Sequence, residues 1–166
     1  VGAEELRRFM KTGGTSLVDV TISGLARDPK ALRRISIEAG VHIIMGTGFY
    51  VQSSHPAFVK KKSVEELSEI MTHELTEGVD GTGIKAGVIG EIGCSTTAIT
   101  DDEKKVLKAA ARAQRETGRP LTVHPSTWDV DKRKLAKNEK EILDLLQKED
   151  MDFAKFYMSH QDYTCT

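Results

Sequence analysis

The feature that most constrains this chain is a regular alternation between short apolar runs and longer amphipathic segments. Five runs have the β-branched, apolar character of buried strands, and they lie at Leu17–Ile22, Val41–Met45, Ile84–Gly93, Leu121–His124 and Phe156–Ser159. Segments of helical periodicity precede or separate them. This alternation is typical of βαβ units, which place parallel strands side by side in one sheet.

The helical segments carry recognisable start signals. The segments Ser63–Glu66 and Thr100–Glu103 each contain the hydroxyl residue and the glutamate of a capping box. Asp28–Pro29 is expected to open an earlier helix, because proline fits the first helical turn. Apolar periodicity predicts two further helices, at Ala3–Lys11 and Asn138–Glu149.

Three successive strand-like runs end in side chains that bind metal ions, namely Glu91, His124 and His160. The carboxyl ends of parallel strands meet at one rim of a sheet, so we expect these side chains to lie together. The packing of an apolar strand gives no reason for a carboxylate at its tip. A carboxylate can also bridge two cations, and the pattern therefore predicts a binuclear metal site.

Two α/β folds are compatible with five strand–helix units, and the position of the predicted metal ligands distinguishes between them. In a doubly wound sheet the ligand collects at one topological switch point. Here several neighbouring strand tips each contribute a ligand, as they do in a (β/α)8 TIM barrel. A whole barrel takes about 250 residues, and this chain has 166. We therefore predict an incomplete barrel of about five βα units, forming a single domain over residues 1–166.

Composition and charge exclude several classes of partner. The formal net charge is −1, which gives no electrostatic reason to expect nucleic acid or an anionic membrane surface. No apolar run approaches the roughly 20 residues of a transmembrane helix. The two cysteines form no CxxC motif, so a reducing, cytoplasmic location is expected. The expected partner is a small-molecule substrate.

Several segments together resemble the phosphotriesterase family of amidohydrolases. The similarity lies in Gly83–Ile89, Leu121–Pro125, Ser159–Asp162, Val106–Ala113 and Ser63–Leu67. The segment Gly90–Ser95 is similar to the phosphotriesterase-related branch of that family. The resemblance covers essentially the whole chain, and it implies a distorted (β/α)8 barrel with a two-metal hydrolytic site.

The resemblance also implies roles for individual residues. Glu91 matches the bridging ligand on the family's fourth strand, where the phosphotriesterases proper have a carboxylated lysine. His124 and His160 match the ligands on the fifth and sixth strands. Tyr50 falls where the family places an aromatic residue on the wall of the substrate pocket, and His55, in the loop that follows, is a candidate substrate contact. The family's first-strand His-x-His pair and eighth-strand aspartate are expected outside these 166 residues.

The function implied by the resemblance is that of a metal-dependent hydrolase. Two divalent metal ions, expected to be zinc, would activate a hydroxide at the catalytic residues Glu91, His124 and His160. The glutamate bridge and the related branch favour an amide of the N-acyl taurine type, an ester or a lactone over an organophosphate triester, and a phosphoester bond is a further candidate target. The alternative is a catalytically incomplete partial barrel that binds one metal at most and self-associates through its exposed sheet edges.

Several of these residues also have simpler interpretations. Glu91 pairing with a lysine, or capping the segment that follows it, is the alternative to a ligand role, and loop structure is the alternative for His55. His42 and His73 are expected to be structural or exposed, since one begins a strand and the other lies inside a helix. Cys94 is expected to be a small buried thiol.

Overall fold

The computed structural model describes residues 2–95, 98–125 and 132–161 of the chain. The sheet contains the strands β1 (Ser16–Asp19), β2 (His42–Thr47), β3 (Val88–Gly93), β4 (Leu121–His124) and β5 (Phe156–Met158). The helices are α1 (Gly2–Lys11), α2 (Pro29–Ala39), α3 (Val64–Thr76), α4 (Asp101–Thr117) and α5 (Lys132–Lys148). Short 3-10 turns lie at η1 (Gln52–Ser54), η2 (Val79–Gly81) and η3 (Phe153–Lys155).

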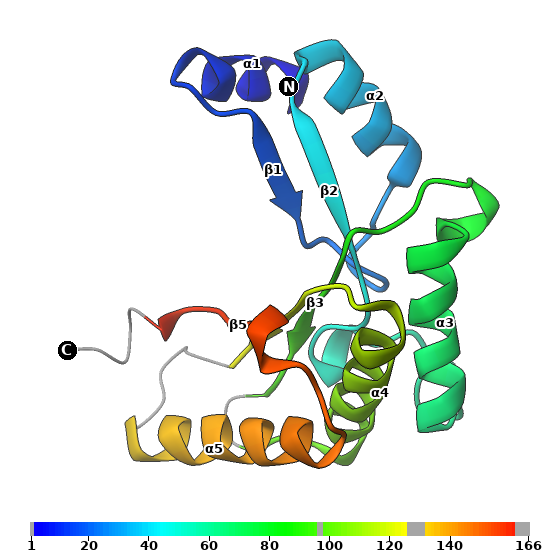
Figure 1. The fold of residues 1–166 in the computed structure, drawn as a ribbon, viewed down its shortest axis with the longest axis vertical. Helices are drawn as coiled ribbons and strands as arrows, with labels where there is room; N and C mark the ends of the chain where they lie inside the picture. The colour runs from blue at the N-terminus through cyan, green and yellow to red at the C-terminus, as the bar shows by residue number, and fades with distance from the viewer. Residues whose placement is uncertain (1, 96–97, 126–131, 162–166) are drawn as a thin grey trace.

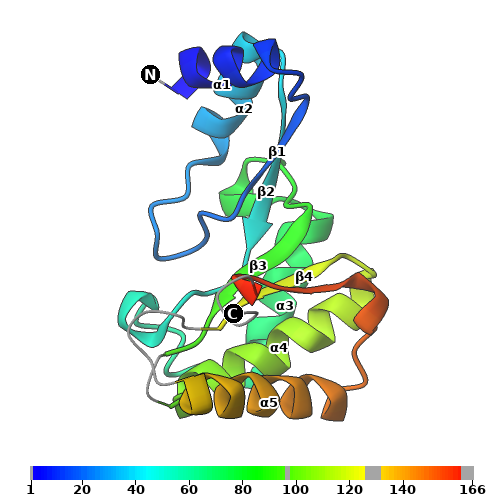
Figure 2. The ribbon, with the colours of Figure 1, turned by 90° about the vertical axis from the view of Figure 1, so that its left-hand side faces the viewer.

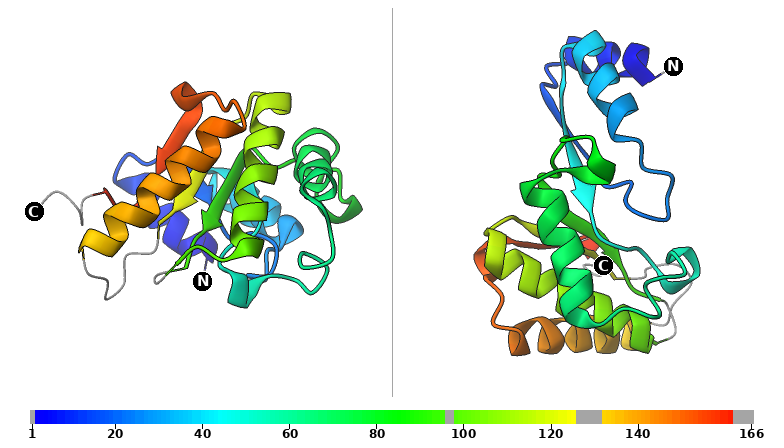
Figure 3. Two further views of the ribbon diagram at one scale, coloured as in Figure 1. Left: turned by 90° about the horizontal axis from the view of Figure 1, so that it is seen from below. Right: turned by 90° about the vertical axis from the view of Figure 1, so that its right-hand side faces the viewer.

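The arrangement of the strands confirms the predicted incomplete barrel. The strands pair in the order β1-β2-β3-β4-β5, and every neighbouring pair is parallel. A doubly wound sheet reverses its strand order at the switch point, and this sheet does not reverse. Helices α2, α3, α4 and α5 follow one side of the curved sheet, like the outer ring of a barrel, as Figures 1 and 3 show. In Figure 2 the sheet faces the viewer from its uncovered side.

The capping predictions are confirmed at three helices. The Ser63 and Thr100 hydroxyls accept hydrogen bonds from the N3 amides of α3 and α4, and both capping boxes are complete. The Asp28 carboxylate caps α2 by accepting from the Ala31 amide. Each of these interactions spans only three residues, which is why the local sequence predicts it.

Two elements differ from expectation at their ends. Strand β3 begins at Val88 and not at Ile84, because the Ala86 amide donates to the Glu74 carbonyl of α3 in place of a sheet partner. Helix α5 begins at Lys132, six residues before the predicted start at Asn138. Its first turns have no apolar stripe, but their lysines, arginine and alanine are good helix formers.

Helix α4 forms the centre of the core. Its small residues Ala109, Ala110 and Ala113 have no exposed surface, and Val106 and Leu107 are equally buried. This face lets α4 contact α3, α5 and strand β3 at close range. No helix in the ranges described above is long and apolar enough to cross a membrane.

A buried ion pair joins the loop before α2 to helix α3. The Arg27 guanidinium makes two hydrogen bonds of 2.7 Å to the Glu74 carboxylate, and these side chains are only 4% and 12% exposed. Arg27 also donates to the Gly46 carbonyl, and the Thr47 hydroxyl donates to Glu74 at 2.5 Å. The pair therefore joins three separate segments, namely the loop before α2, strand β2 and helix α3.

Candidate metal centre

Glu91, His124 and His160 meet at the carboxyl end of the sheet. Each offers one ligand atom, and these three atoms all lie within 4.8 Å of one another. Glu91 comes from β3, His124 ends β4, and His160 follows β5 by two residues. The two imidazole rings have centroids 4.7 Å apart and stand nearly perpendicular, at 86°. The structure thus brings together all three side chains that the strand ends predict.

A local irregularity in β3 carries Glu91 to this position. The register between β3 and β4 shifts between Ile89 and Ile92, as at a β-bulge. Gly90 lies inside the shift with φ 118°, and a Cβ there would approach the Thr122 carbonyl oxygen to 2.3 Å. Only glycine satisfies both conditions, which accounts for the residue that precedes Glu91.

The Glu91 carboxylate has a defined set of neighbours. The Ser159 hydroxyl donates a short hydrogen bond to Oε1, and the His124 Nδ1 lies 3.5 Å from Oε2. Burial by itself raises the pKa of Glu91. The neighbouring His124, the Ser159 hydroxyl and His160 together outweigh that effect, so the pKa lies below its ordinary value. Glu91 is therefore a carboxylate at neutral pH.

The donor set fits a divalent metal ion. The His124 ring is buried, and its Nδ1 has no hydrogen-bond partner among the described residues. A buried polar atom without a partner is costly, and coordination to a metal would remove that cost. Two imidazoles and one carboxylate also match catalytic zinc sites, which use three protein ligands and leave one position open.

Tyr50 lies directly beside this cluster. Its ring centroid is 5.2 Å from that of His124, at an interplanar angle of 51°. Burial, and then the negative charge of Glu91, raise the pKa of Tyr50 above its ordinary value. The phenol therefore keeps its proton at neutral pH and offers a hydrogen-bond donor next to the site.

His55 does not join the cluster. Its Nε2 lies 2.7 Å from the Tyr50 carbonyl oxygen, and Nε2 must carry the hydrogen because a carbonyl only accepts. The ring also packs edge-on against Phe49, with centroids 6.3 Å apart. These contacts support the loop that holds Tyr50, so the structure favours the structural interpretation of His55, and a substrate contact stays a prediction.

Gly93 allows the Tyr50 loop to lie against the end of β3. A Cβ at this position would approach the Val51 nitrogen to 2.4 Å and the Tyr50 carbonyl carbon to 2.6 Å. Both are backbone atoms, which cannot move aside as the end of a side chain can. We predict that Gly93→Ala lowers the free energy of unfolding by about 1–3 kcal/mol, as over-packing does elsewhere, measured by urea denaturation.

The matched control is Gly2→Ala. A Cβ at Gly2 would meet only the flexible end of the Ile35 side chain, at 3.2 Å. Gly2 lies in helix α1, where alanine is the better helix former, so no loss of stability is expected. Equal stability of the Gly93→Ala and Gly2→Ala variants would contradict the close approach of the two segments.

The sequence does not predict the roles that Ser159 and Glu103 have near the site. Ser159 appears only as the end of a strand-like run, and no spacing rule points from it to Glu91. Glu103 is recognisable as part of a capping box, but its complete burial is not. The other predicted features of this region agree with the structure, since Cys94 is buried and both His42 and His73 are exposed.

Comparison of the sequence with known protein families supports the assignment that the site residues indicate. The phosphotriesterase family matches this sequence over residues 1–166. The chain belongs to the phosphotriesterase family. The resemblance that the sequence motifs indicate is thereby confirmed.

The chain is similar to several individual members of the phosphotriesterase family. It is 42% identical to the human N-acetyltaurine hydrolase over 161 residues, which is 97% of this chain and 44% of that protein. It is 44% identical to a phosphotriesterase-related protein of Nematostella vectensis, covering 96% of this chain and 43% of that one. A resiniferatoxin-binding protein from Rhodobacter sphaeroides superposes with a TM-score of 0.90 at 39% identity, over 98% of this chain and 43% of that chain. The chain spans less than half the length of these relatives.

The phosphotriesterase family barrel also explains an apolar hollow on the uncovered side of the sheet. The hollow has a volume of about 480 Å³, and Glu91 and Ser159 are among the residues that line it. Its lining includes Val18, Ile44 and Tyr157, whose exposed fractions are 50%, 40% and 65%. In a closed barrel this face would be interior, where layers of side chains fill the space.

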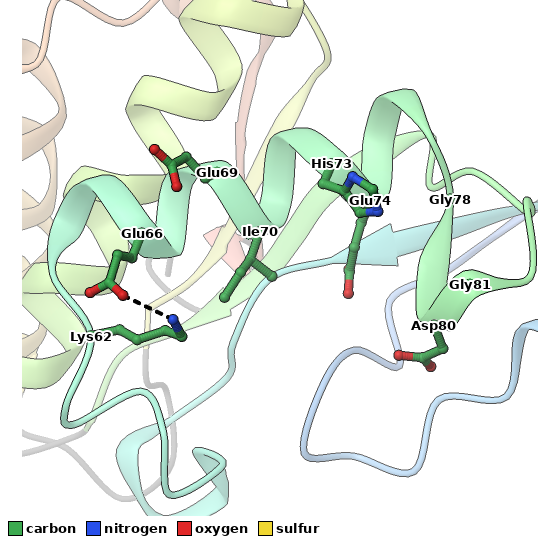
Figure 4. Close-up of a pocket in the computed structure, with 9 residues that line it drawn as sticks. All are labelled: Lys62, Glu66, Glu69, Ile70, His73, Glu74, Gly78, Asp80 and Gly81. Carbon is green, nitrogen blue, oxygen red and sulfur yellow. Dashed lines mark hydrogen bonds and ion pairs between the residues drawn. The ribbon is translucent and has the colours of Figure 1, made fainter.

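A second hollow, beside α3, is separate from the candidate metal centre. It has a volume of about 450 Å³, and its lining includes Glu66, Glu69, His73 and Asp80, as Figure 4 shows. None of the three clustered side chains at the sheet end lines it. Acidic side chains gathered on a helix surface are commonly solvated, and we assign no function to this hollow.

Proposed function

We propose that this chain provides the metal-binding part of a hydrolase site of the phosphotriesterase family. The observation that carries the proposal is the cluster of Glu91, His124 and His160, with ligand atoms within 4.8 Å and a buried His124 Nδ1 that lacks a partner. These residues would hold one divalent ion, for which zinc is the expected identity. Glu91 would also be available as a ligand to a second ion, as the resemblance to the family implies.

The chain's own groups have distinct parts in the proposed chemistry. A bound divalent metal lowers the pKa of a water molecule and polarises the bond under attack. Glu91 supplies negative charge without covalent modification, and Ser159 fixes its orientation by donating to Oε1. The neutral Tyr50 phenol is placed to donate to a substrate carbonyl and forms one wall of the proposed pocket.

The proposed substrates are amides of the N-acyl taurine type, esters and lactones. Glu91 stands where the phosphotriesterases proper have a carboxylated lysine, which sets this chain apart from enzymes for phosphotriesters. A relative named N-acetyltaurine hydrolase, 42% identical over 97% of the chain, supports an amide as the first substrate class to test.

The proposed location is the cytoplasm. Cys94 is a free thiol with 1% of its surface exposed. Burial, followed by the charges of Glu103 and Glu141, raises the pKa of this thiol well above its ordinary value. A buried, unreactive thiol that forms no disulfide among the described residues suits a reducing compartment.

The second candidate is a partial barrel without enzymatic activity. The apolar side chains exposed on the inner face of the sheet favour this hypothesis, because such a surface promotes association. Strands β1 and β5 also form the two edges of the sheet. In this case copies of the chain would associate through these edges, and a metal ion would bind without hydrolysis.

Metal titration followed by a hydrolysis panel tests the proposal. The purified protein, stripped with a chelator, is expected to bind about one equivalent of Zn²⁺ through the three clustered ligands. With metal it should hydrolyse N-acetyltaurine, an aryl ester or a lactone faster than a phosphotriester. The absence of specific metal binding would overturn the proposed site. Metal binding without hydrolysis of any substrate would favour the partial barrel.

A further inference from the structure

Glu103 is a buried carboxylate that connects two loops at the rim of the metal centre. It occupies the N3 position of α4 and has no exposed surface. Its Oε1 accepts from the Gln52 amide at 2.9 Å and from the Ser95 hydroxyl at 2.5 Å. Its Oε2 accepts from the Ser95 amide at 3.1 Å and from the Thr100 amide at 2.9 Å. Each oxygen thus receives two hydrogen bonds, which is the full capacity of an ionised carboxylate.

These contacts exceed what a helix cap requires. A capping box needs only the reciprocal bonds between Thr100 and Glu103. The Gln52 and Ser95 contacts reach 51 and 8 residues along the chain. They end in the loops that follow β2 and β3, and the first of these loops carries Tyr50.

The path from Glu103 to the metal centre is short. Gln52 follows Tyr50 by two residues, and the Tyr50 ring packs on His124. Ser95 follows Cys94, whose amide donates to the His124 carbonyl at 3.1 Å. One carboxylate therefore anchors both sides of the region around His124.

We propose that Glu103 is a positioning residue that holds Tyr50 over His124 and thereby shapes the substrate pocket. The inference rests on the proposed function for the role of Tyr50, but the loop anchoring is testable without it. Glu103 does not touch the three clustered side chains in any contact described above, so its effect would act through the two loops.

The test compares Glu103→Gln with the matched variant Glu66→Gln. Glutamine keeps one acceptor oxygen but turns an NH₂ group toward donors that need an acceptor. Glu66 holds the same N3 position in the capping box of α3, where it accepts from the Ser63 amide at 2.8 Å, and it touches neither rim loop. Glu66→Gln therefore removes the charge of a capping glutamate and its ion pair with Lys62, while glutamine still fits a capping box, and neither rim loop is affected.

Amide hydrogen exchange, measured on the protein with and without added Zn²⁺, is the first readout. In Glu103→Gln we expect exchange at Gln52 and Ser95 to accelerate by roughly 10-fold or more, with Val106 of α4 unchanged. Glu66→Gln should leave all three amides as they are in the wild type. Unchanged exchange at Gln52 and Ser95, or equal acceleration throughout α4, would overturn the proposal.

Kinetics and metal content form the second readout. Glu103→Gln should raise KM by roughly 10-fold and change kcat less, because it loosens a pocket wall and not a reacting group. Its zinc content should equal that of the wild type, and loss of zinc would overturn the proposal by giving Glu103 a role in holding the ligands. If the wild type hydrolyses nothing in the panel, the proposed function fails, and the exchange comparison still decides whether Glu103 anchors the loops.

Discussion

His124→Ala is expected to weaken Zn²⁺ binding more than about 100-fold, since loss of a group that merely orients a ligand already costs 10–100-fold. The His124 side chain is 7% exposed, and it is one of only three clustered ligands among the described residues. Metal-dependent hydrolysis should be lost with the metal. The measurement is a competition titration of Zn²⁺ against a chelator of known affinity, on the wild-type and variant proteins.

The same variant should fold normally without metal. The His124 Nδ1 makes no hydrogen bond in the described part of the chain, and the Glu91 carboxylate beside it keeps the hydrogen bond from the Ser159 hydroxyl when the ring is removed. His73→Ala is the matched control, because His73 is an exposed histidine on α3. It should retain wild-type Zn²⁺ affinity. A His124→Ala protein that still binds zinc with wild-type affinity would refute the assignment of this ligand.

The parts of the fold that the sequence predicts are those set by local or periodic interactions. Both capping boxes and the Asp28 cap involve residues three apart, and their chemistry is visible in any short window. The gathering of Glu91, His124 and His160 follows from parallel strand order, because such strands all end at one rim. Most of the candidate site could therefore be predicted from the order of the parallel strands.

The features that the sequence does not predict depend on contacts between distant segments. Strand β3 begins late because the Ala86 amide bonds to α3, which no window around Ala86 reveals. Glu103 looks like an ordinary cap until Gln52, 51 residues away, is found beside it. Arg27 and Glu74 are 47 residues apart, and each alone looks like a surface charge. Their burial is a property of the assembled fold.

Arg27→Met is expected to lower the free energy of unfolding by about 3–5 kcal/mol, the usual cost of removing one member of a buried pair. The variant leaves the Glu74 carboxylate, 12% exposed, without its two bonds from the guanidinium. Figure 4 shows Glu74 extending from α3 toward β2, where the Thr47 hydroxyl is its other partner. One neutral hydroxyl does not compensate a buried negative charge. Urea denaturation measures the effect.

A double variant separates the ion pair from the packing of its side chains. Arg27→Met with Glu74→Leu replaces both charges by apolar groups, and it should be more stable than either single variant because no charge is left buried and unpaired. Asp144→Asn is the control, since it breaks the exposed Lys140–Asp144 pair, whose side chains are 74% and 49% exposed. Exposed pairs contribute little, so no measurable change is expected there. If Arg27→Met is no more destabilising than Asp144→Asn, the buried pair does not hold the β1–α2 loop against α3.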